Sequence, residues 1–219
     1  MEHYNPLLTK NICTEKFITI GEIMLRLTPP NYEKIRMTTS FEASYGGSEA
    51  NIALSLANLG VDSTFFSVVP NNSLGKSAIR MLRSNDVHCT PVILSTPEQT
   101  PTHRLGSYYL ETGFGIRASE VTYDRKNSAI TEFDFDTIDL AGLLEGFTWL
   151  HLSGITPALA EFCINEGIGM QVHLSETKLE HEQCVEKYGL TPAQVLDCHH
   201  VFDAPTTAAH CVHLTQEDM

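Results

Sequence analysis

The sequence predicts an α/β protein: part of a doubly wound parallel sheet, a small β lid, and further strand–helix units near the carboxyl end. Three observations predict this class. Apolar runs typical of buried strands alternate with helical runs along the chain. The segment of about residues 104–130 instead alternates polar and apolar residues, as in a half-solvated antiparallel sheet. The 219 residues, 42% of them hydrophobic, suffice for a packed core.

The first α/β unit is predicted near the amino end. FITIGEIMLRL, residues 17–27, is a β-rich apolar run suited to a buried first strand. Gly46 and Gly47 then precede a helix in which alanine and leucine recur at helical spacing. Gly60 follows that run and is expected to end the helix. The order strand, loop, glycine turn and helix is typical of a parallel sheet.

The next elements continue the alternation and then interrupt it. VDSTFFSVVP, residues 61–70, predicts a strand, and NSLGKSAIRMLRSNDV, residues 72–87, predicts a helix. RLGSYYLETG and ASEVTYDRKNSAI, both within residues 104–130, expose tyrosines and an arginine. A plain hairpin with exposed aromatic residues and a lid over a substrate explain this pattern equally well.

The last quarter predicts two more strand–helix units. GIGMQVHLSE, residues 167–176, reads as a buried strand, and TKLEHEQCVEKYG, residues 177–189, as a helix that stops at its final glycine. Thr191 and Pro192 open a short helix as cap and first residue. TTAAHCVHL, residues 206–214, predicts a second strand. These strands are expected either to extend the first sheet or to pack loosely beside it.

The final residues, LTQEDM, place Thr215 three residues before Asp218. This spacing resembles a capping box, which predicts a helix that starts where the sequence stops. We therefore expect a truncated element at this end.

Composition excludes several classes of protein. The formal charge of −13 argues against a nucleic-acid partner, which would require clustered lysine and arginine. No apolar run reaches the roughly 18 residues of a membrane span, and the first residues lack the pattern of a signal peptide. The six cysteines stand singly, without C-x-x-C, which suits a reducing compartment. The expectation is a cytoplasmic protein with neither a membrane nor a nucleic-acid partner.

Several residues are candidates for ligand binding on their own chemistry. Backbone N–H groups at Gly46 and Gly47 could approach a ligand closely at a helix N-terminus, and Asn51 could add its amide. A tight turn feeding an alanine-packed helix explains the same glycines, and spacing alone favours it. His173 lies near the carboxyl end of the predicted strand 167–176, and the predicted strand 206–214 carries His210. Without further support, isolated histidines are more often core or surface residues than zinc ligands.

Four stretches in the same order resemble the PfkB (ribokinase-like) carbohydrate kinases, and together the 2-keto-3-deoxygluconate kinase branch. They are GEIMLRLTPP, YGGSEANIALSLANLG, YYLETGFGIRASEVTYDRKNSA and FTWLHLSGITPAL, between about Phe17 and Cys163. The resemblance implies a ribokinase-like fold with a β lid and a kinase that phosphorylates a sugar acid with ATP and Mg²⁺. It implies that Gly46, Gly47 and Asn51 hold sugar hydroxyls. It also implies that Tyr108, Tyr123 and Arg125 reach the substrate from the lid. The planar guanidinium of Arg125 suits a carboxylate.

The sequence departs from that family in its catalytic part. Such kinases carry a Gly-Ala-Gly-Asp element that forms the anion hole and supplies the base for phosphoryl transfer. The 219 residues contain no such element, and GIGMQVHLSET stands where a strand with Asp-x-Asn is expected. We therefore expect no catalytic residue, a largely absent ATP site, and at most substrate binding.

Residues 167–219 resemble a different family, the amidohydrolase superfamily, and especially its methylthioadenosine and S-adenosylhomocysteine deaminases. VHLSETKLEHEQCVEKYGLTPAQVLD and DAPTTAAHCVHLTQED carry this resemblance. It implies a piece of a β/α barrel in which His210 is a metal ligand and His173 contacts substrate and metal-bound water. His213 stands where some relatives carry an acidic proton shuttle. With the H-x-H pair and a further Asp absent, the resemblance implies weak zinc binding and no complete deaminase.

The two resemblances meet near residues 163–167, where composition also changes. Residues 167–219 hold two basic and eight acidic residues and six of the ten histidines. We expect a chimera with an amino-terminal extension at 1–16, a kinase-like part at 17–163 and a deaminase-like part at 164–219. Three hypotheses remain: a sugar-acid-binding kinase fragment, a zinc deaminase fragment, and a non-catalytic fusion or designed product. The lid is also the expected surface for any self-association.

Overall fold

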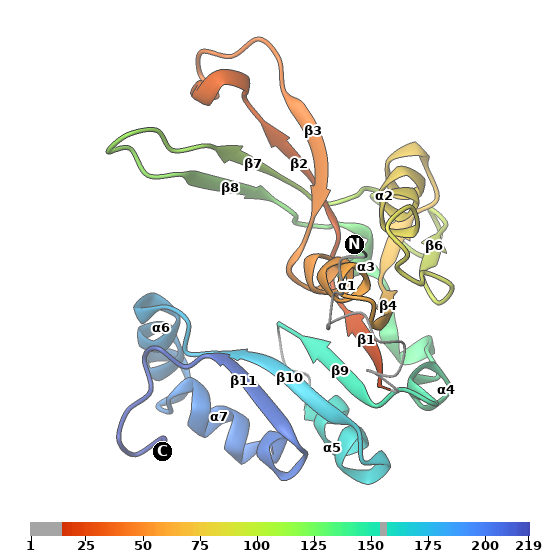
Figure 1. Cartoon of the computed structure of the whole chain (residues 1–219), viewed down its shortest axis with the longest axis vertical. Helices are drawn as coiled ribbons and strands as arrows, with labels where there is room; N and C mark the ends of the chain where they lie inside the picture. The colour runs from red at the N-terminus through yellow and green to blue at the C-terminus, as the bar shows by residue number, and fades with distance from the viewer. Residues whose placement is uncertain (1–14, 154–156) are drawn as a thin grey trace, which may run out of the picture.

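The computed structural model describes residues 15–153 and 157–219 (Figure 1). Most of the expected amino-terminal extension, and residues 154–156 of the kinase-like stretch, lie outside the described residues. The central feature is a five-stranded sheet in the order β11-β10-β9-β1-β4, with every neighbouring pair parallel. Its strands are β1 (Lys16–Ile20), β4 (Asp62–Phe66), β9 (Trp149–Leu152), β10 (Gly169–Leu174) and β11 (Thr206–His210).

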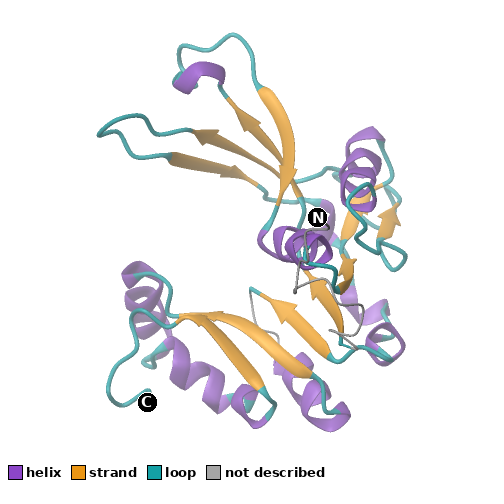
Figure 2. Cartoon of the chain, in the orientation of Figure 1, coloured by secondary structure: helices purple, strands orange, loops and turns teal. Residues whose placement is uncertain are grey.

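A second sheet forms the lid, which extends away from the central sheet (Figure 2). Its order is β3-β2-β7-β8, with β2 and β7 parallel and the outer pairs antiparallel. Its strands are β2 (Met24–Thr28), β3 (Glu42–Gly46), β7 (Ser107–Glu111) and β8 (Glu120–Asp124). The lid is therefore larger than the expected segment 104–130, which supplies only β7 and β8.

The prediction of one buried strand over residues 17–27 was wrong. The segment is divided between β1 in the central sheet and β2 in the lid, with Gly21 and Glu22 at the break. A side chain at Gly21 would stand 2.3 Å from the carboxyl group of Glu49, so that carboxyl group would have to shift to admit one. Apolar sequence alone does not reveal such a break, because both strands are partly buried.

Helices and short strands complete the first half of the chain. Helix α1 (Ser48–Asn58) follows the glycine turn, as predicted, and it packs on β1 and β4. The predicted strand over 61–70 is divided into β4 and β5 (Val68–Pro70), and β5 pairs with β6 (Ile93–Ser95). Helix α2 (Ser73–Arg83) begins at Asn72, whose side chain accepts hydrogen bonds from two N–H groups of its first turn.

Shorter elements connect these parts to the carboxyl half. They are α3 (Ala129–Glu132), α4 (Leu140–Leu144), α5 (Pro157–Glu166), and the 3₁₀ turns Pro30–Tyr32, Phe135–Thr137 and Val201–Asp203. After α5, Gly167 adopts a left-handed backbone (φ +67°) that turns the chain into β10.

The predicted helices of the last quarter are confirmed, while its second strand is shorter than predicted. Helix α6 (Lys178–Tyr188) begins with a capping box at Thr177 and stops at Gly189, whose φ is +70°. Helix α7 (Pro192–Cys198) begins with a second capping box at Thr191 and has proline in its first turn. Strand β11 ends at His210, four residues before the predicted end, because His210 and Cys211 turn to positive φ.

Strands β10 and β11 extend the kinase-like sheet. Val172 and Met170 on β10 are fully buried in the same hydrophobic cluster as Ile18 on β1 and Leu150 on β9. Leu196 of α7 joins this cluster. The two parts of the chain therefore share one core.

Two further observations concern the described residues. None of their helices is long and apolar enough to span a membrane. Near the carboxyl end, the N–H and hydroxyl groups of Thr215 donate to the Asp218 carboxylate, at 2.7 and 2.9 Å. These bonds, with the Asp218 N–H donating to the Thr215 carbonyl, close a single turn, and the helix expected to begin there stays a prediction.

Candidate functional site

A cleft of about 760 Å³ opens between the lid and the ends of the central strands. It lies where the carboxyl ends of parallel strands meet, the usual ligand position in such sheets. Its lining comes from both parts of the chain: Ile20, Gly21, Glu22, Met24, Ser48, Glu49, Tyr123, Arg125, Ile130, Thr131, Ser153, His173, Glu176 and Glu180. Two of the six candidate sugar contacts, Tyr123 and Arg125, are among them.

The glycine turn stands beside this cleft and is closely packed. A side chain at Gly47 would lie 2.0 Å from the carbonyl oxygen of Glu22, and one at Gly46 would lie 2.8 Å from the Tyr108 hydroxyl. The same point at Gly46 is 3.7 Å from the side-chain oxygen of Asn51. The structure thus gathers Gly46, Asn51 and Tyr108, while the cleft itself is lined by the following residues Ser48 and Glu49.

The lid presents an aromatic pair and a paired arginine. Tyr108 and Tyr123 face each other across β7 and β8, with ring centroids 5.8 Å apart. The Arg125 guanidinium forms an ion pair with Glu22, at 2.8 Å between Nη2 and Oε2. Arg125 remains 53% exposed, and a guanidinium has five N–H donors, so donors remain for a ligand.

Glu22 is a site residue that sequence reasoning missed. Its side chain is 7% exposed, and its other oxygen accepts a hydrogen bond of 2.6 Å from the Ser128 hydroxyl. A side chain at Gly106 would lie 2.3 Å from that oxygen, so the carboxylate is enclosed as well as paired. The signal in the sequence was that Glu22 stands in the middle of an apolar run predicted to be buried. A buried carboxylate requires a partner, so its presence there indicated a paired acid.

Glu49 links the first turn of α1 to the end of β9. This carboxylate is 6% exposed and accepts hydrogen bonds from the Ser153 N–H, at 2.9 Å, and from the Ser153 hydroxyl. The Glu49 carbonyl accepts from the Thr19 hydroxyl at 3.1 Å. The link holds β1, α1 and β9 together at the floor of the cleft.

The two predicted histidines come together in the central sheet. His173 on β10 and His210 on β11 lie on paired strands, with ring centroids 4.9 Å apart and rings edge to face. Glu176, just beyond β10, lies 3.8 Å from Nε2 of His210. One ligand atom from each of these three residues lies within 4.8 Å of the other two. Sequence reasoning missed Glu176, although its place three residues after His173 was a usable signal.

A third histidine continues this row toward the core. His151 on β9 is 1% exposed, and its ring centroid is 5.4 Å from that of His173. Burial lowers the pKa of His151, with the nearby Glu49 carboxylate acting in the opposite direction. His213, expected where relatives carry an acidic group, donates its backbone N–H to the Ser175 carbonyl.

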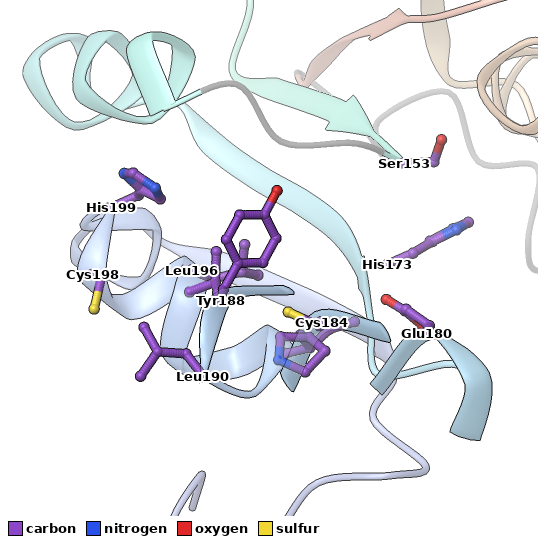
Figure 3. A pocket seen from close by; sticks show the side chains of 12 residues that line it. Ser153, His173, Glu180, Cys184, Tyr188, Leu190, Leu196, Cys198 and His199 are labelled. Atoms are coloured by element: carbon purple, nitrogen blue, oxygen red, sulfur yellow. The ribbon is translucent and has the colours of Figure 1, made fainter. Parts of the chain in front are cut away.

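A second hollow of about 530 Å³ adjoins the cleft and shares Ser153, His173 and Glu180 with it. Figure 3 shows these three residues at one end of the hollow and Tyr188 and His199 farther along it. The two hollows therefore meet at Ser153, His173 and Glu180.

Comparisons with known proteins decide the family. The pfkB family of carbohydrate kinases matches residues 14–168. The chain belongs to this family. A 2-dehydro-3-deoxygalactonokinase of Haloferax volcanii is 34% identical over 148 residues, which are 68% of this chain and 44% of that protein. The crystal structure of the 2-dehydro-3-deoxygluconokinase of Thermotoga maritima aligns with a TM-score of 0.69 and 35% identity, over 78% of this chain and 55% of that one.

The family membership agrees with the fold. The parallel sheet with its mixed lid is a ribokinase-like arrangement. The chain nevertheless spans less than half the length of the curated kinase with which it is compared above.

A shorter similarity points to a second family. A 5-methylthioadenosine/S-adenosylhomocysteine deaminase of Caldanaerobacter subterraneus subsp. tengcongensis is 57% identical over 53 residues, 24% of this chain and 12% of that protein. This is a partial match and covers a small part of that enzyme.

The pfkB kinases use ATP and Mg²⁺, and the described residues do not fit a nucleotide well. Beyond β9, the strand ends carry His173 and His210, with Glu176 beside them. The glycine-rich anion hole is absent from the 219 residues.

Proposed function

We propose that this chain binds a sugar acid of the 2-keto-3-deoxygluconate type in the cleft under the lid, without transferring a phosphoryl group to it. One observation carries the proposal: Arg125 and Tyr123 of the lid line the same cleft as the first turn of α1. The names of the kinase relatives support the substrate class.

The chemistry of Arg125 explains the preference for an acid. Glu22 holds the guanidinium in place through one nitrogen, and the exposed remainder can donate to a ligand carboxylate. Tyr123 lines the cleft, and Tyr108, the glycine turn and Asn51 stand beside it; their hydroxyl, backbone and amide groups are of the kind that suits sugar hydroxyls. A neutral hexose could bind to the hydroxyl, amide and backbone groups but has no carboxylate to offer Arg125.

Calorimetric titration with 2-keto-3-deoxygluconate and with glucose tests this proposal. The acid is expected to bind about tenfold tighter or more, since a hydrogen bond to a charged group contributes about 1.5–3 kcal/mol. Arg125→Ala should remove the preference. Arg125→Lys keeps a charge beside Glu22 but loses the planar fork, so it should retain only part of the preference.

Lys126→Ala is the matched control, because it removes one positive charge from the next residue, which is outside the lining of the cleft. Its titration should match that of the unaltered chain. Equal binding of acid and hexose, or binding of neither, contradicts the proposal.

We propose further that the chain joins a kinase part to a deaminase-like part near residues 163–167, and that the second part has no deaminase activity. The partial deaminase match and the shift in charge and histidine content support this reading. Ammonia release from methylthioadenosine or S-adenosylhomocysteine should stay at background. Measurable release would favour the deaminase hypothesis instead.

A further inference from the structure

We propose that a second copy of this chain docks on helix α2, through a turn at residues 134–136 that inserts into a hollow between α2 and β6. The basic hollow is lined by Lys76, Ile79, Arg80, Arg83, Val92 and Leu94. The acidic turn consists of Asp134, Phe135 and Asp136. Neither surface belongs to the lid or lines the cleft, so the contact is independent of the proposed sugar-acid binding.

The basic hollow joins apolar side chains to a rim of cations. Its volume is about 340 Å³, and its residues come from α2 and from β6 with the residue before it (Figure 1). Ile79 of α2 is buried, while Leu94 of β6 is exposed. The aliphatic stems of Lys76 and Arg80 can add to this apolar surface while their charged ends stay in water. The hollow therefore suits an apolar side chain that has negative charge beside it.

The three cations of the rim form no ion pair among the residues that the structure describes. Lys76, Arg80 and Arg83 recur at helical spacing along α2, which contains no acidic residue. Neighbouring like charges on one helix face repel each other. The carboxyl end of a helix favours Arg80 and Arg83, but Lys76 lies nearer the amino end, where a cation is unfavourable. An anionic partner would offset this repulsion.

The acidic turn presents an aromatic side chain between two carboxylates. It lies between α3 and α4 (Figure 1), and Phe135 at its centre is 37% exposed. Asp134 and Asp136 are exposed and form no ion pair within the described part of the chain. The surrounding sequence contains no lysine or arginine between Lys126 and Lys178. The turn therefore offers the negative charge and the apolar group that the basic hollow suits.

Local contacts hold the acidic turn in shape before any partner binds. The Asp134 carboxylate accepts a hydrogen bond of 3.1 Å from the Asp136 N–H, and the Asp134 carbonyl accepts one of 2.7 Å from the Thr137 hydroxyl. The ring of Phe135 packs edge to face with that of Phe133, with centroids 5.5 Å apart. A turn that is already ordered loses less conformational entropy when it binds.

Charge complementarity favours a second copy as the occupant of the basic hollow. The chain has a formal charge of −13, yet the rim brings three of its 14 basic residues together within one helix. Phe135 would fill the apolar part of the hollow, where an arginine beside its ring would add a cation–π contact. The two carboxylates of the acidic turn would pair with the rim. Because the contact joins two different surfaces, each copy can bind one neighbour through its hollow and another through its turn.

Sedimentation velocity of the full chain, over a series of protein concentrations, tests the contact. We expect the average mass to rise with concentration. Arg80→Glu in the rim and Phe135→Ala in the turn should each weaken the association about tenfold or more, as for residues at the centre of an interface. The melting temperature of each variant shows whether it is folded.

Two variants are matched controls. Phe202→Ala removes an aromatic ring that is 39% exposed and, like Phe135, precedes an aspartate. Lys187→Glu makes the same reversal of charge as Arg80→Glu, on the exposed side of α6. Both controls should associate as the unaltered chain does. Equal losses in the controls would show a general effect of charge or hydrophobicity and would contradict the contact.

A mixture of the two site variants gives the sharpest result. The Arg80→Glu chain keeps its acidic turn and the Phe135→Ala chain keeps its basic hollow, so one intact contact can form between them. We expect a dimer that grows no further. A mixture that stays monomeric would overturn the proposal, as would an unaltered chain that stays monomeric at every concentration. Association that persists in both single variants would place the interface on another surface, such as the lid, and would also overturn it.

Discussion

Helix α1 in the first half of the chain and helix α6 in the last quarter each have eleven residues. Helix α1 packs on two strands of the central sheet and buries Ala50 and Ala53. Helix α6 buries none of its residues, and its apolar side chains are 41–62% exposed: Leu179, Val185 and Tyr188. The strand before α6, β10, is nevertheless fully integrated into the sheet and the core.

This difference separates two requirements of an α/β fold. Parallel strands pair through main-chain groups that every sequence has, so β10 and β11 can continue a sheet begun by other residues. Helix packing needs side chains that fit the surface beneath them, and Ala50 and Ala53 meet that need in α1. Strands β10 and β11 of the last quarter are therefore fully part of the sheet, whereas helix α6 buries none of its residues.

The largest expected effect is the absence of phosphoryl transfer, although the first region has the form of a kinase. The first region retains the lid and glycine turn, but neither region carries the Gly-Ala-Gly-Asp element. Loss of a single donor of this kind costs about 10²–10³ in kcat. An ADP-release assay with ATP, Mg²⁺ and 2-keto-3-deoxygluconate should therefore show background turnover. Robust turnover that depends on the sugar acid would reveal a base outside the residues considered above.

Met170→Ala tests how firmly β10 belongs to the core. Met170 on β10 is fully buried in the core that the two parts share, and its truncation should lower the free energy of unfolding by about 2–5 kcal/mol. Leu179→Ala on α6, where the side chain is 62% exposed, should change it by about 0.5 kcal/mol or less. Urea unfolding measures both. Similar small effects would mean that the last quarter packs loosely.

Cys163 reports on the junction itself. It is fully buried, and burial raises the pKa of its thiol to about 11. At neutral pH this leaves about 10²-fold less thiolate than in an ordinary cysteine, and the core also blocks access. Iodoacetamide followed by mass spectrometry should label the exposed Cys198 at least about 10²-fold faster. Equal labelling rates would place the junction outside a stable core.

The two capping boxes of the last quarter provide the smallest contrast. Thr191, at the start of α7, is 9% exposed, and its hydroxyl also donates to the Asp218 carboxylate. Thr191→Ala should cost about 1 kcal/mol in the free energy of unfolding, while Thr177→Ala, at the exposed start of α6, should cost less. Thermal or urea unfolding of the two variants checks the order. A larger loss for Thr177→Ala would indicate that α6 is better supported than its burial suggests.

Most local structure was predictable because it depends on neighbouring residues. The starts of α6 and α7 follow from Thr177 and Thr191, and the end of α6 follows from Gly189. The lid strands β7 and β8 follow from alternating polar and apolar residues. Six candidate sugar contacts were named from the family resemblance, and their roles stay predictions.

The sequence by itself determined the α/β class, the helix caps and the resemblance to two families, because each depends on local chemistry or on motifs of short range. Only the tertiary structure decided that residues 17–27 divide between two sheets and that Glu22 pairs with Arg125. It also decided that Glu176 lies beside two histidines on adjacent strands. These contacts join residues that are up to about a hundred positions apart. The position of each depends on how the strands order themselves in the sheet, which no single segment specifies.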